Sequence, residues 1–267
     1  MTAPFFARGA RRVVGVVHLP PLPGSPRWGG DFDAVLARAR ADLLALAEGG
    51  VDAAIVENFG DAPFRPGAVE PETVAAMARV LAELRPLTAL PLGVNVLRND
   101  AAAALALAAV CGGAFIRVNV HSGAMVTDQG VIAGRADRTL RRRRELGAEG
   151  VAILADVLVK HAAPLGAVTI EEAARDAVER GLADALIVTG TGTGRATDLA
   201  DVRRVRAALP DVPLLVGSGV DERTIGETLT VADGAIVGTA LKVGGVTTAP
   251  VDPERVRRLV AAARGRG

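Results

Sequence analysis

Residues 213–240, PLLVGSGVDERTIGETLTVADGAIVGTA, contain the repeat that decides the fold of this 267-residue chain. A short apolar run ends in glycine and polar residues, a helical stretch follows, and the next apolar run begins. Eight such runs occur along the chain, over residues 13–19, 53–57, 92–96, 114–119, 151–157, 185–189, 213–217 and 235–237. Strands that alternate with helices in this way predict an α/β protein, a single (β/α)8 TIM barrel, and we expect residues 1–267 to form one domain.

The lengths of the connecting segments indicate where the functional site lies. Segments from a helix to the next strand are short, as in residues 49–51, 111–113, 181–183 and 209–212. Segments from a strand to the next helix are long in residues 19–30, 59–70, 121–134 and 158–168. Long loops cost ordering entropy and are usually retained for a function. We therefore expect the site at the carboxyl ends of the strands, where these loops gather.

Composition excludes several classes of partner. The formal net charge is +1, aromatic residues make up 3% of the chain and tyrosine is absent. Nucleic acid binding relies on cationic patches and stacking aromatics, so we expect no nucleic acid partner. No apolar run approaches the roughly 18 residues of a membrane span, and residues 1–10 lack the apolar core of a signal peptide. We therefore expect a cytoplasmic protein with no membrane span.

The last two strand ends carry a pattern typical of phosphate binding. Glycine lets the backbone approach a ligand closely, and many barrels hold a substrate phosphate at this place. The predicted phosphate-binding residues are Gly217, Ser218, Gly219, Gly238 and Thr239. The alternative is that the glycines serve only a tight strand-to-helix turn. Lys242 follows closely, and its ammonium group would either pair with the anion or reach solvent.

Residues 189–194, TGTGTG, place further donors beside the same region. Their spacing fits neither a Walker loop nor a Rossmann fingerprint. We expect Thr189 and Gly190 to contact substrate; the alternative is a glycine-rich loop without a ligand. Asp198, at the start of the next helix, would repel an anion, so the phosphate is expected nearer the last two strands.

Five consecutive apolar runs end in polar or ionisable residues. These residues are His18, Glu57, Asn58, Asn95 followed by Arg98, Arg117, Asn119, and Asp156 followed by Lys160 and His161. They are distant in sequence, but a barrel would bring them around one mouth. Asn58, Asn95, Arg117, Asn119 and His161 are the further candidates for substrate binding.

Chemical roles follow from the residue types. Glu57 or Asp156 is the candidate general base and His18 a proton shuttle. Lys160 would stabilise a developing oxyanion or, if neutral, form an imine. Arg117 would hold a second anionic group of the substrate. The structural alternative is that the two carboxylates only pair with Arg117 or Lys160, and that His18 is a hydrogen-bonded structural histidine.

Metal binding is only weakly indicated. His18, Glu57, Asp156 and His161 offer nitrogen and oxygen ligands, but neither a His-x-His pair nor a His-Glu-x-x-His motif occurs. No cofactor is therefore predicted. Mg²⁺ held by a carboxylate and a substrate phosphate is compatible with this set.

A proline-rich stretch follows the first strand. Residues 19–28, LPPLPGSPRW, contain four prolines and form an extended, stiff excursion. Trp28 at its end would either close over a ligand or pack on a neighbour, including another subunit of a homo-oligomer.

Several blocks of the chain resemble the BtpA/SgcQ family. They are residues 15–26 (GVVHLPPLPGSP), 56–61 (VENFGD), 93–100 (GVNVLRND), 115–120 (FIRVNV), 154–157 (LADV), 159–162 (VKHA), the TG pairs at 189–190 and 193–194, 216–220 (VGSGV) and 236–242 (IVGTALK). The resemblance covers nearly the whole chain. It implies a barrel of the ribulose-phosphate-binding type. Members are named for photosystem I accumulation in photosynthetic bacteria and for a carbohydrate operon.

Two functions are therefore expected as alternatives. The first is an enzyme that acts on a small phosphorylated metabolite, a sugar phosphate or nucleotide-like compound, by isomerase, epimerase or lyase chemistry. The second, which the family names imply, is a non-catalytic assembly or stability factor that uses the barrel as a scaffold.

Overall fold

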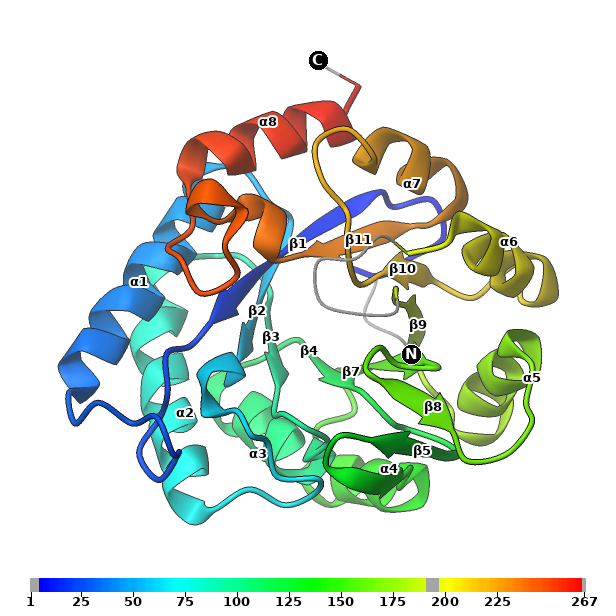
Figure 1. Cartoon of the computed structure of the whole chain (residues 1–267), viewed down its shortest axis with the longest axis horizontal. Helices are drawn as coiled ribbons and strands as arrows, with labels where there is room; N and C mark the ends of the chain where they lie inside the picture. Colours follow the sequence, from blue (N-terminus) through cyan, green and yellow to red (C-terminus); the bar gives the residue numbers. More distant parts are fainter. Residues whose placement is uncertain (1–4, 191–196, 266–267) are drawn as a thin grey trace.

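The computed structural model describes residues 5–190 and 197–265, and in that part of the chain a closed parallel barrel is the main feature (Figure 1). Its strands are β1 (Arg12–His18), β2 (Ala53–Glu57), β3 (Leu92–Asn95), β4 (Phe115–Val118), β7 (Ala152–Val157), β9 (Ala185–Val188), β10 (Leu214–Val216) and β11 (Gly234–Val237). Their order around the barrel is β1-β11-β10-β9-β7-β4-β3-β2, and parallel pairing of β1 with β11 closes it. The predicted (β/α)8 fold is confirmed.

Helices surround the barrel in Figure 1. They are α1 (Phe32–Glu48), α2 (Pro71–Leu84), α3 (Ala101–Cys111), α4 (Ala136–Glu145), α5 (Ile170–Arg175), α6 (Leu199–Ala208), α7 (Ile225–Val231) and α8 (Pro253–Ala263). Shorter helical turns are η1 (Phe59–Asp61), η2 (Arg85–Leu87), η3 (Asp176–Arg180), η4 (Thr239–Leu241) and η5 (Val243–Gly245). The side chains of Asp31, Asp100, Asp198 and Asp252 each accept a backbone N–H at a helix start. Asp198 therefore caps α6, which explains why a carboxylate occurs there.

Alternation along the strands produces two apolar layers. On β1, Val14 and Val16 belong to a cluster inside the barrel, whereas Val13 and Val17 belong to the layer between strands and helices. The inner cluster ends in Phe6, whose ring meets that of Phe115 edge-on at a centroid distance of 5.0 Å. The barrel is thus a packed core.

Phe115 fits inside the barrel because the residue opposite it is glycine. A Cβ atom added to Gly93 would lie 2.1 Å from Cε2 of Phe115. We expect Gly93→Ala to lower the free energy of unfolding by about 1–3 kcal/mol, because an overpacked core must shift side chains or backbone. Urea unfolding measures the change. Gly150→Ala is the control, since a Cβ there meets nothing within 4 Å; equal stability of the two variants would contradict this account.

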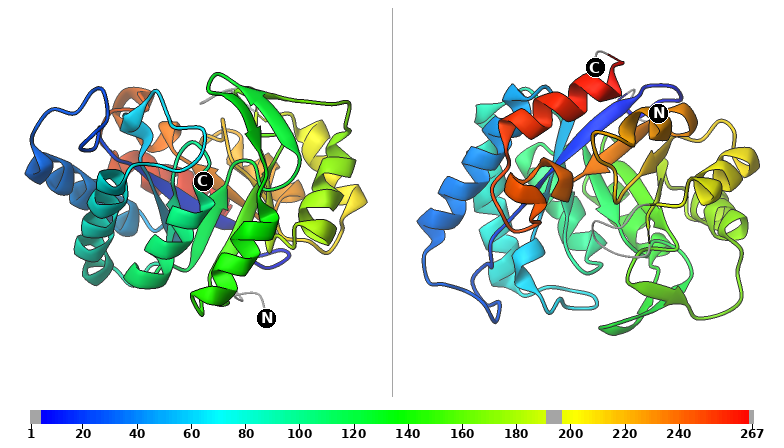
Figure 2. Two further views of the ribbon diagram at one scale, coloured as in Figure 1. Left: turned by 90° about the horizontal axis from the view of Figure 1, so that it is seen from below. Right: turned by 45° about the horizontal axis from the view of Figure 1, so that its top comes forward.

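Two of the long loops form a second, small sheet at one end of the barrel. Strands β5 (Ala124–Thr127), β6 (Gly130–Ala133) and β8 (Ala162–Pro164) pair antiparallel in the order β6-β5-β8. In the left view of Figure 2 this sheet rises on the same side as the cyan loop after β2 and the blue loop after β1. We expected only long loops over residues 121–134 and 158–168, and the small sheet was not predicted.

The proline-rich stretch packs tightly on its own subunit. A Cβ on Gly60 would lie 2.3 Å from the nitrogen of Pro21, and the amide of Leu22 donates to Asp61 at 2.7 Å. Trp28 packs near Phe32 of α1, with a distance of 6.4 Å between ring centroids. Trp28 packs on its own subunit and does not line the cavity at the barrel mouth, although Arg27 beside it does.

Candidate functional site at the barrel mouth

A large cavity lies where the carboxyl ends of the strands meet the long loops; we call it the mouth cavity. Its volume is about 840 Å³. Apolar side chains of Leu19, Pro21, Phe59 and Phe64 form part of its wall. Polar and charged groups lining it are His18, Arg27, Arg38, Glu57, Asn95, Arg98, Arg117, Asn119, Asp128, Lys160, His161 and Thr248. The predicted site thus lies at the predicted end of the barrel.

A smaller cavity of about 220 Å³ adjoins the turns after β10 and β11; we call it the glycine cavity. All five residues predicted to bind phosphate line it, namely Gly217, Ser218, Gly219, Gly238 and Thr239. Gly219 has a φ of +65°, a backbone conformation that favours glycine. Arg255, at the start of α8, also lines this cavity and donates from Nε to the carbonyl of Ala240 at 2.8 Å.

Four predicted residues line both cavities. They are His18, Glu57, Arg117 and Lys160, which come from β1, β2, β4 and the loop after β7. The two cavities therefore meet at the ionisable groups for which the sequence predicts acid–base roles.

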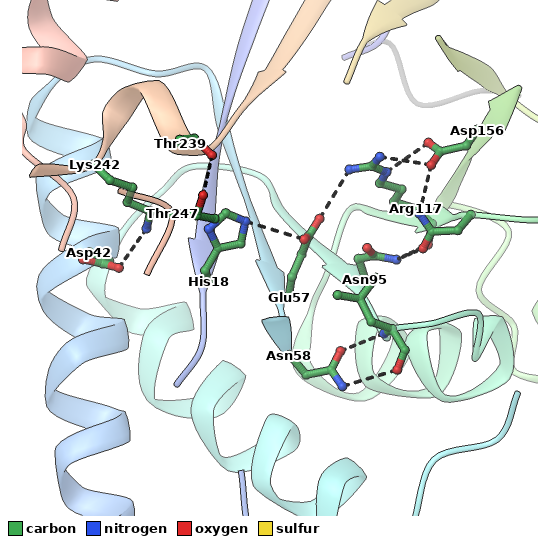
Figure 3. A network of polar contacts seen from close by, with 12 residues as sticks. His18, Asp42, Glu57, Asn58, Asn95, Arg117, Asp156, Thr239, Lys242 and Thr247 are labelled. Atoms are coloured by element: carbon green, nitrogen blue, oxygen red, sulfur yellow. Dashed lines mark hydrogen bonds and ion pairs between the residues drawn. The ribbon is translucent and has the colours of Figure 1, made fainter. Parts of the chain in front are cut away.

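Arg117 organises the base of the mouth (Figure 3). It donates from Nε and Nη2 to the two oxygens of Asp156, both at 3.0 Å, and its Nη1 lies 3.5 Å from Glu57. Burial disfavours its charge, but Asp156 and Glu57 outweigh burial and raise the pKa of Arg117. Asn119 donates a third hydrogen bond to Asp156 at 2.9 Å. The charge of Arg117 is therefore already compensated inside the protein.

Glu57 is held less firmly than Asp156. One of its oxygens is 3.5 Å from Arg117 and the other is 3.8 Å from Nε2 of His18. The pKa of His18 lies well below its usual range because the ring is buried and because Lys242 and Lys160 add positive charge nearby. His18 is thus neutral at pH 7 and lies within reach of Glu57.

Besides Nδ1 of His18, two buried polar atoms at the mouth cavity have no hydrogen-bond partner within the described part of the chain. They are Oδ1 of Asn95 and Nε of Arg98. Asn95 uses its amide nitrogen to donate to the carbonyl of Arg117 at 3.0 Å. Burial lowers the pKa of Arg98. Buried polar groups are normally hydrogen-bonded, so these two atoms mark places where a ligand or water would be bound.

Lys242 was predicted either to pair with the bound anion or to reach solvent, and the structure shows neither. Its side chain is fully buried, and Nζ contacts Asp42 of α1 at 3.1 Å. Asp42 also accepts from Arg38 at 3.1 Å and from the amide of Val251 at 2.8 Å. Lys242 therefore ties the end of the barrel to α1, and it neither lines the glycine cavity nor reaches solvent.

Four predicted site residues lie outside both cavities. Asn58 fixes the loop after β3, accepting from the amide of Leu97 at 2.7 Å. Asp156 lies behind Arg117. Thr189 accepts from the amide of Lys160 at 3.0 Å, and Gly190 follows it at the edge of another surface hollow. Residues 191–194 of the TGTGTG run lie outside the described residues.

Sequence reasoning assigned no role to several residues of the site. Phe59, Phe64, Arg27 and Asp128 lie in long loops, where nothing in the local pattern indicates which side chain points inward. Arg255 was missed because it lies in the first turn of α8, where the local pattern does not show that its side chain reaches the glycine cavity.

Two observations bear on ions and membranes. Among residues 5–190 and 197–265, no group of three or more His, Cys, Asp or Glu side chains is arranged to hold a metal ion. In the same part of the chain, none of the helices combines the length and apolar character needed to cross a bilayer.

Fold and site define a TIM-barrel protein whose ionisable groups gather at the carboxyl-end mouth beside two glycine turns. The model of the BtpA family matches residues 10–265, and the chain belongs to that family. It is 50% identical to the photosystem I biogenesis protein BtpA of Synechocystis sp. over 94% of this chain and 87% of that protein. It is 36% identical to the putative sgc region protein SgcQ of Escherichia coli, over 94% and 93%. The expected membership is thereby confirmed.

A solved structure shares the fold at low sequence identity. Thiamine phosphate pyrophosphorylase from Pyrococcus furiosus superposes with a TM-score of 0.60 and 14% identity, over 96% of this chain and 98% of that one. At this identity the likeness establishes the barrel architecture only.

Proposed function

We propose that this protein is an enzyme that acts on a small phosphorylated metabolite, a sugar phosphate or nucleotide-like compound. The observation that carries the proposal is the junction of the two cavities. A glycine-lined cavity of about 220 Å³ opens next to a larger cavity, and His18, Glu57, Arg117 and Lys160 line both. A phosphate in the first cavity would place the rest of the substrate beside these groups.

The glycine cavity suits an anion in shape and charge. Glycines leave the backbone exposed to a ligand, and Arg255 has no acidic ion-pair partner among the described residues. Asp221 is a carboxylate that lines the glycine cavity, but it accepts hydrogen bonds from the amides of Arg223 and Thr224. Its charge is therefore directed into the turn, and Arg255 is the group best placed to attract phosphate.

The geometry favours Glu57 over Asp156 as the general base. Asp156 accepts three hydrogen bonds from Arg117 and Asn119 and lines neither cavity. Glu57 lines both cavities and keeps only two longer contacts. Proton abstraction requires an oxygen within reach of substrate. We therefore assign Glu57 as base, neutral His18 as the proton shuttle, and Asp156 as the group that positions Arg117.

The reaction class follows from these groups. A base, a neutral imidazole and a nearby cation can move a proton next to a carbonyl and stabilise the resulting oxyanion. Isomerisation, epimerisation and aldol-type cleavage of sugar phosphates share this step. These residue roles need no cofactor, and a Mg²⁺ ion held chiefly by substrate phosphate oxygens is compatible with them.

Mass spectrometry of metabolites released from the purified native protein tests the proposal. A phosphorylated compound present in proportion to protein supports it. A protein that carries no metabolite, binds no sugar phosphate in calorimetry and co-purifies with a membrane complex would instead favour an assembly factor. That alternative rests on the name of the cyanobacterial relative, a photosystem I biogenesis protein.

We expect Gly238→Ala to weaken the binding of phosphorylated ligands about tenfold or more. An added Cβ would lie 2.8 Å from Cε1 of His18 and would enter the glycine cavity. The methyl group would push the His18 ring aside and crowd the exposed backbone that is expected to contact the anion. A tenfold loss of affinity corresponds to about 1.4 kcal/mol. Isothermal titration with inorganic phosphate and ribose 5-phosphate measures the effect.

Gly226→Ala is the matched control for Gly238→Ala. A Cβ at Gly226 meets nothing within 4 Å, and the residue lies on α7 away from both cavities. This variant should bind phosphate like the parent chain. Unchanged phosphate affinity in Gly238→Ala, with the fold intact by circular dichroism, would contradict the assignment of the glycine cavity.

A further inference from the structure

We propose that Lys160 forms a covalent imine with a phosphorylated aldehyde or ketone bound across the two cavities. This inference rests on the proposed function, because it takes the phosphate-binding role of the glycine cavity as given. It adds a nucleophile and a substrate class, since a carbonyl group becomes a requirement for the substrate.

The distribution of lysine in the chain is the first observation. The chain has 31 basic residues, and Lys160 and Lys242 are the two lysines among them; all the others are arginine. Arginine supplies surface charge and ion pairs throughout this protein. We therefore infer that each of the two lysines has a role that arginine could not fill. For Lys242 the reason is the compact buried contact with Asp42. Lys160 has no such contact, so it needs another explanation.

The side-chain amine of Lys160 has no polar partner among the described residues. Its Nζ makes no hydrogen bond and no ion pair with the residues that the structure describes, and the side chain lines both cavities. Its backbone, in contrast, is fixed on both sides. The amide donates to Thr189 at 3.0 Å, and the carbonyl accepts from Arg98 at 2.6 Å. A rigid backbone thus presents a free amine at the junction of the cavities.

Burial and the charges around Lys160 make its neutral form more accessible than that of an exposed lysine. The groups that act on it are Arg117 on β4, Glu57 on β2, Asp156 on β7 and Arg98 after β3. Burial, together with the two arginines, lowers the pKa of Lys160 to about 8 against the opposing effect of the two carboxylates. A part of the amine is then unprotonated near neutral pH, which a guanidinium group never achieves.

The covalent step balances with the groups present. The lone pair of Nζ adds to the carbonyl carbon, and the nitrogen passes a proton to the former carbonyl oxygen to give a carbinolamine. The hydroxyl group then takes a second proton, supplied by Glu57 in its protonated form or by water, and leaves as water. The product is a protonated imine on Lys160. Its positive nitrogen withdraws electrons, so Glu57 can remove a proton from the adjacent carbon to give an enamine.

Borohydride trapping tests the proposal. The full-length protein is incubated with dihydroxyacetone phosphate or glyceraldehyde 3-phosphate and reduced with sodium borohydride, which converts an imine into a stable secondary amine. Intact mass and peptide mapping then locate the adduct. We expect one adduct per chain, on Lys160 and not on Lys242, and at least tenfold less labelling with the unphosphorylated dihydroxyacetone and glyceraldehyde. The initial rate of trapping should rise with pH through about 8, because the neutral amine is the nucleophile.

The Lys160→Arg variant separates the imine from phosphate binding. It keeps a positive charge but cannot form an imine, so it should lose the adduct and still bind inorganic phosphate in calorimetry. If the parent chain binds phosphate but no phosphorylated carbonyl compound labels Lys160, the imine is wrong and the proposed function stands. If phosphate does not bind at all, the proposed function itself fails. Labelling that occurs equally with unphosphorylated compounds, or only at the amino terminus, also overturns the imine.

Discussion

The Arg117→Met variant is expected to lose about 3–5 kcal/mol of unfolding free energy, a value typical of removing one member of a buried charge pair. The exposed fractions of the Arg117, Glu57 and Asp156 side chains are 4%, 7% and 0%. Methionine fills a similar volume but removes the guanidinium group that contacts both carboxylates, and Lys160 and Arg98 make no ion pair with either of them in the described structure. Urea unfolding at pH 7 measures the difference from the parent chain.

The loss should come from the charge of the two buried carboxylates that Arg117 contacts in the parent chain. The double variant Arg117→Met/Asp156→Asn removes one of the two charges and should recover part of the stability at pH 7.

Arg144→Gln is the control for Arg117→Met. Arg144 pairs with Glu149 at 3.0 Å, but 84% of its side chain is exposed, so we expect a change below about 0.5 kcal/mol. If Arg117→Met unfolds at the same urea concentration as the parent chain, the network is not a stabilising element. If the single variant does not fold, the double variant decides: a double variant that also fails contradicts the charge explanation.

Glu57→Gln is expected to reduce turnover by about 10²–10⁴-fold, the range for loss of a general base. Glutamine keeps the size of the side chain and an oxygen that can accept a hydrogen bond from Arg117. Its neutral amide cannot take a proton from substrate. Exchange of carbon-bound hydrogen for deuterium, followed by NMR in D₂O, reports this step for phosphorylated aldoses and ketoses. The metabolite that co-purifies with the protein is the first substrate to use.

Asp156→Asn is the informative comparison for Glu57→Gln. Asp156 supports Arg117 and lines neither cavity, so we expect a loss of stability with turnover reduced less than tenfold. Glu145→Gln on the exposed side of α4 should change neither property. Loss of exchange in a folded Asp156→Asn variant, with normal exchange in Glu57→Gln, would transfer the role of base to Asp156. Normal exchange in both would remove carboxylate catalysis from the proposal.

The barrel was predictable because its signal is local. Runs such as Val13–Val17 are rich in β-branched residues and recur with helical stretches between them, and burial of a strand on both faces needs little more than this. The positions of His18, Glu57, Asn95 and Arg117 followed from the same pattern, because every strand of a parallel barrel ends at the same rim. The glycine turns after β10 and β11 also line a single cavity.

Side-chain partners were not predictable in this way. Lys242 and Asp42 are 200 residues apart, and their contact depends on how α1 packs against the turn after β11. Glu57 and Asp156 look alike in the sequence, and both end a buried strand. Their difference arises because Arg117 and Asn119 surround Asp156 while Glu57 keeps contact with both cavities. The small sheet of β5, β6 and β8 likewise depends on pairing between two distant loops.

By itself, the sequence determined the barrel and the end at which its ionisable groups gather, because apolar periodicity and glycine turns act within a few residues. The resemblance of several sequence blocks indicated the family. Only the tertiary structure decided which carboxylate contacts the cavities, that Lys242 is a buried structural cation and that the amine of Lys160 lies at their junction without a polar partner among the described residues. These properties depend on burial and on the distances between charges from different strands, which no local pattern encodes.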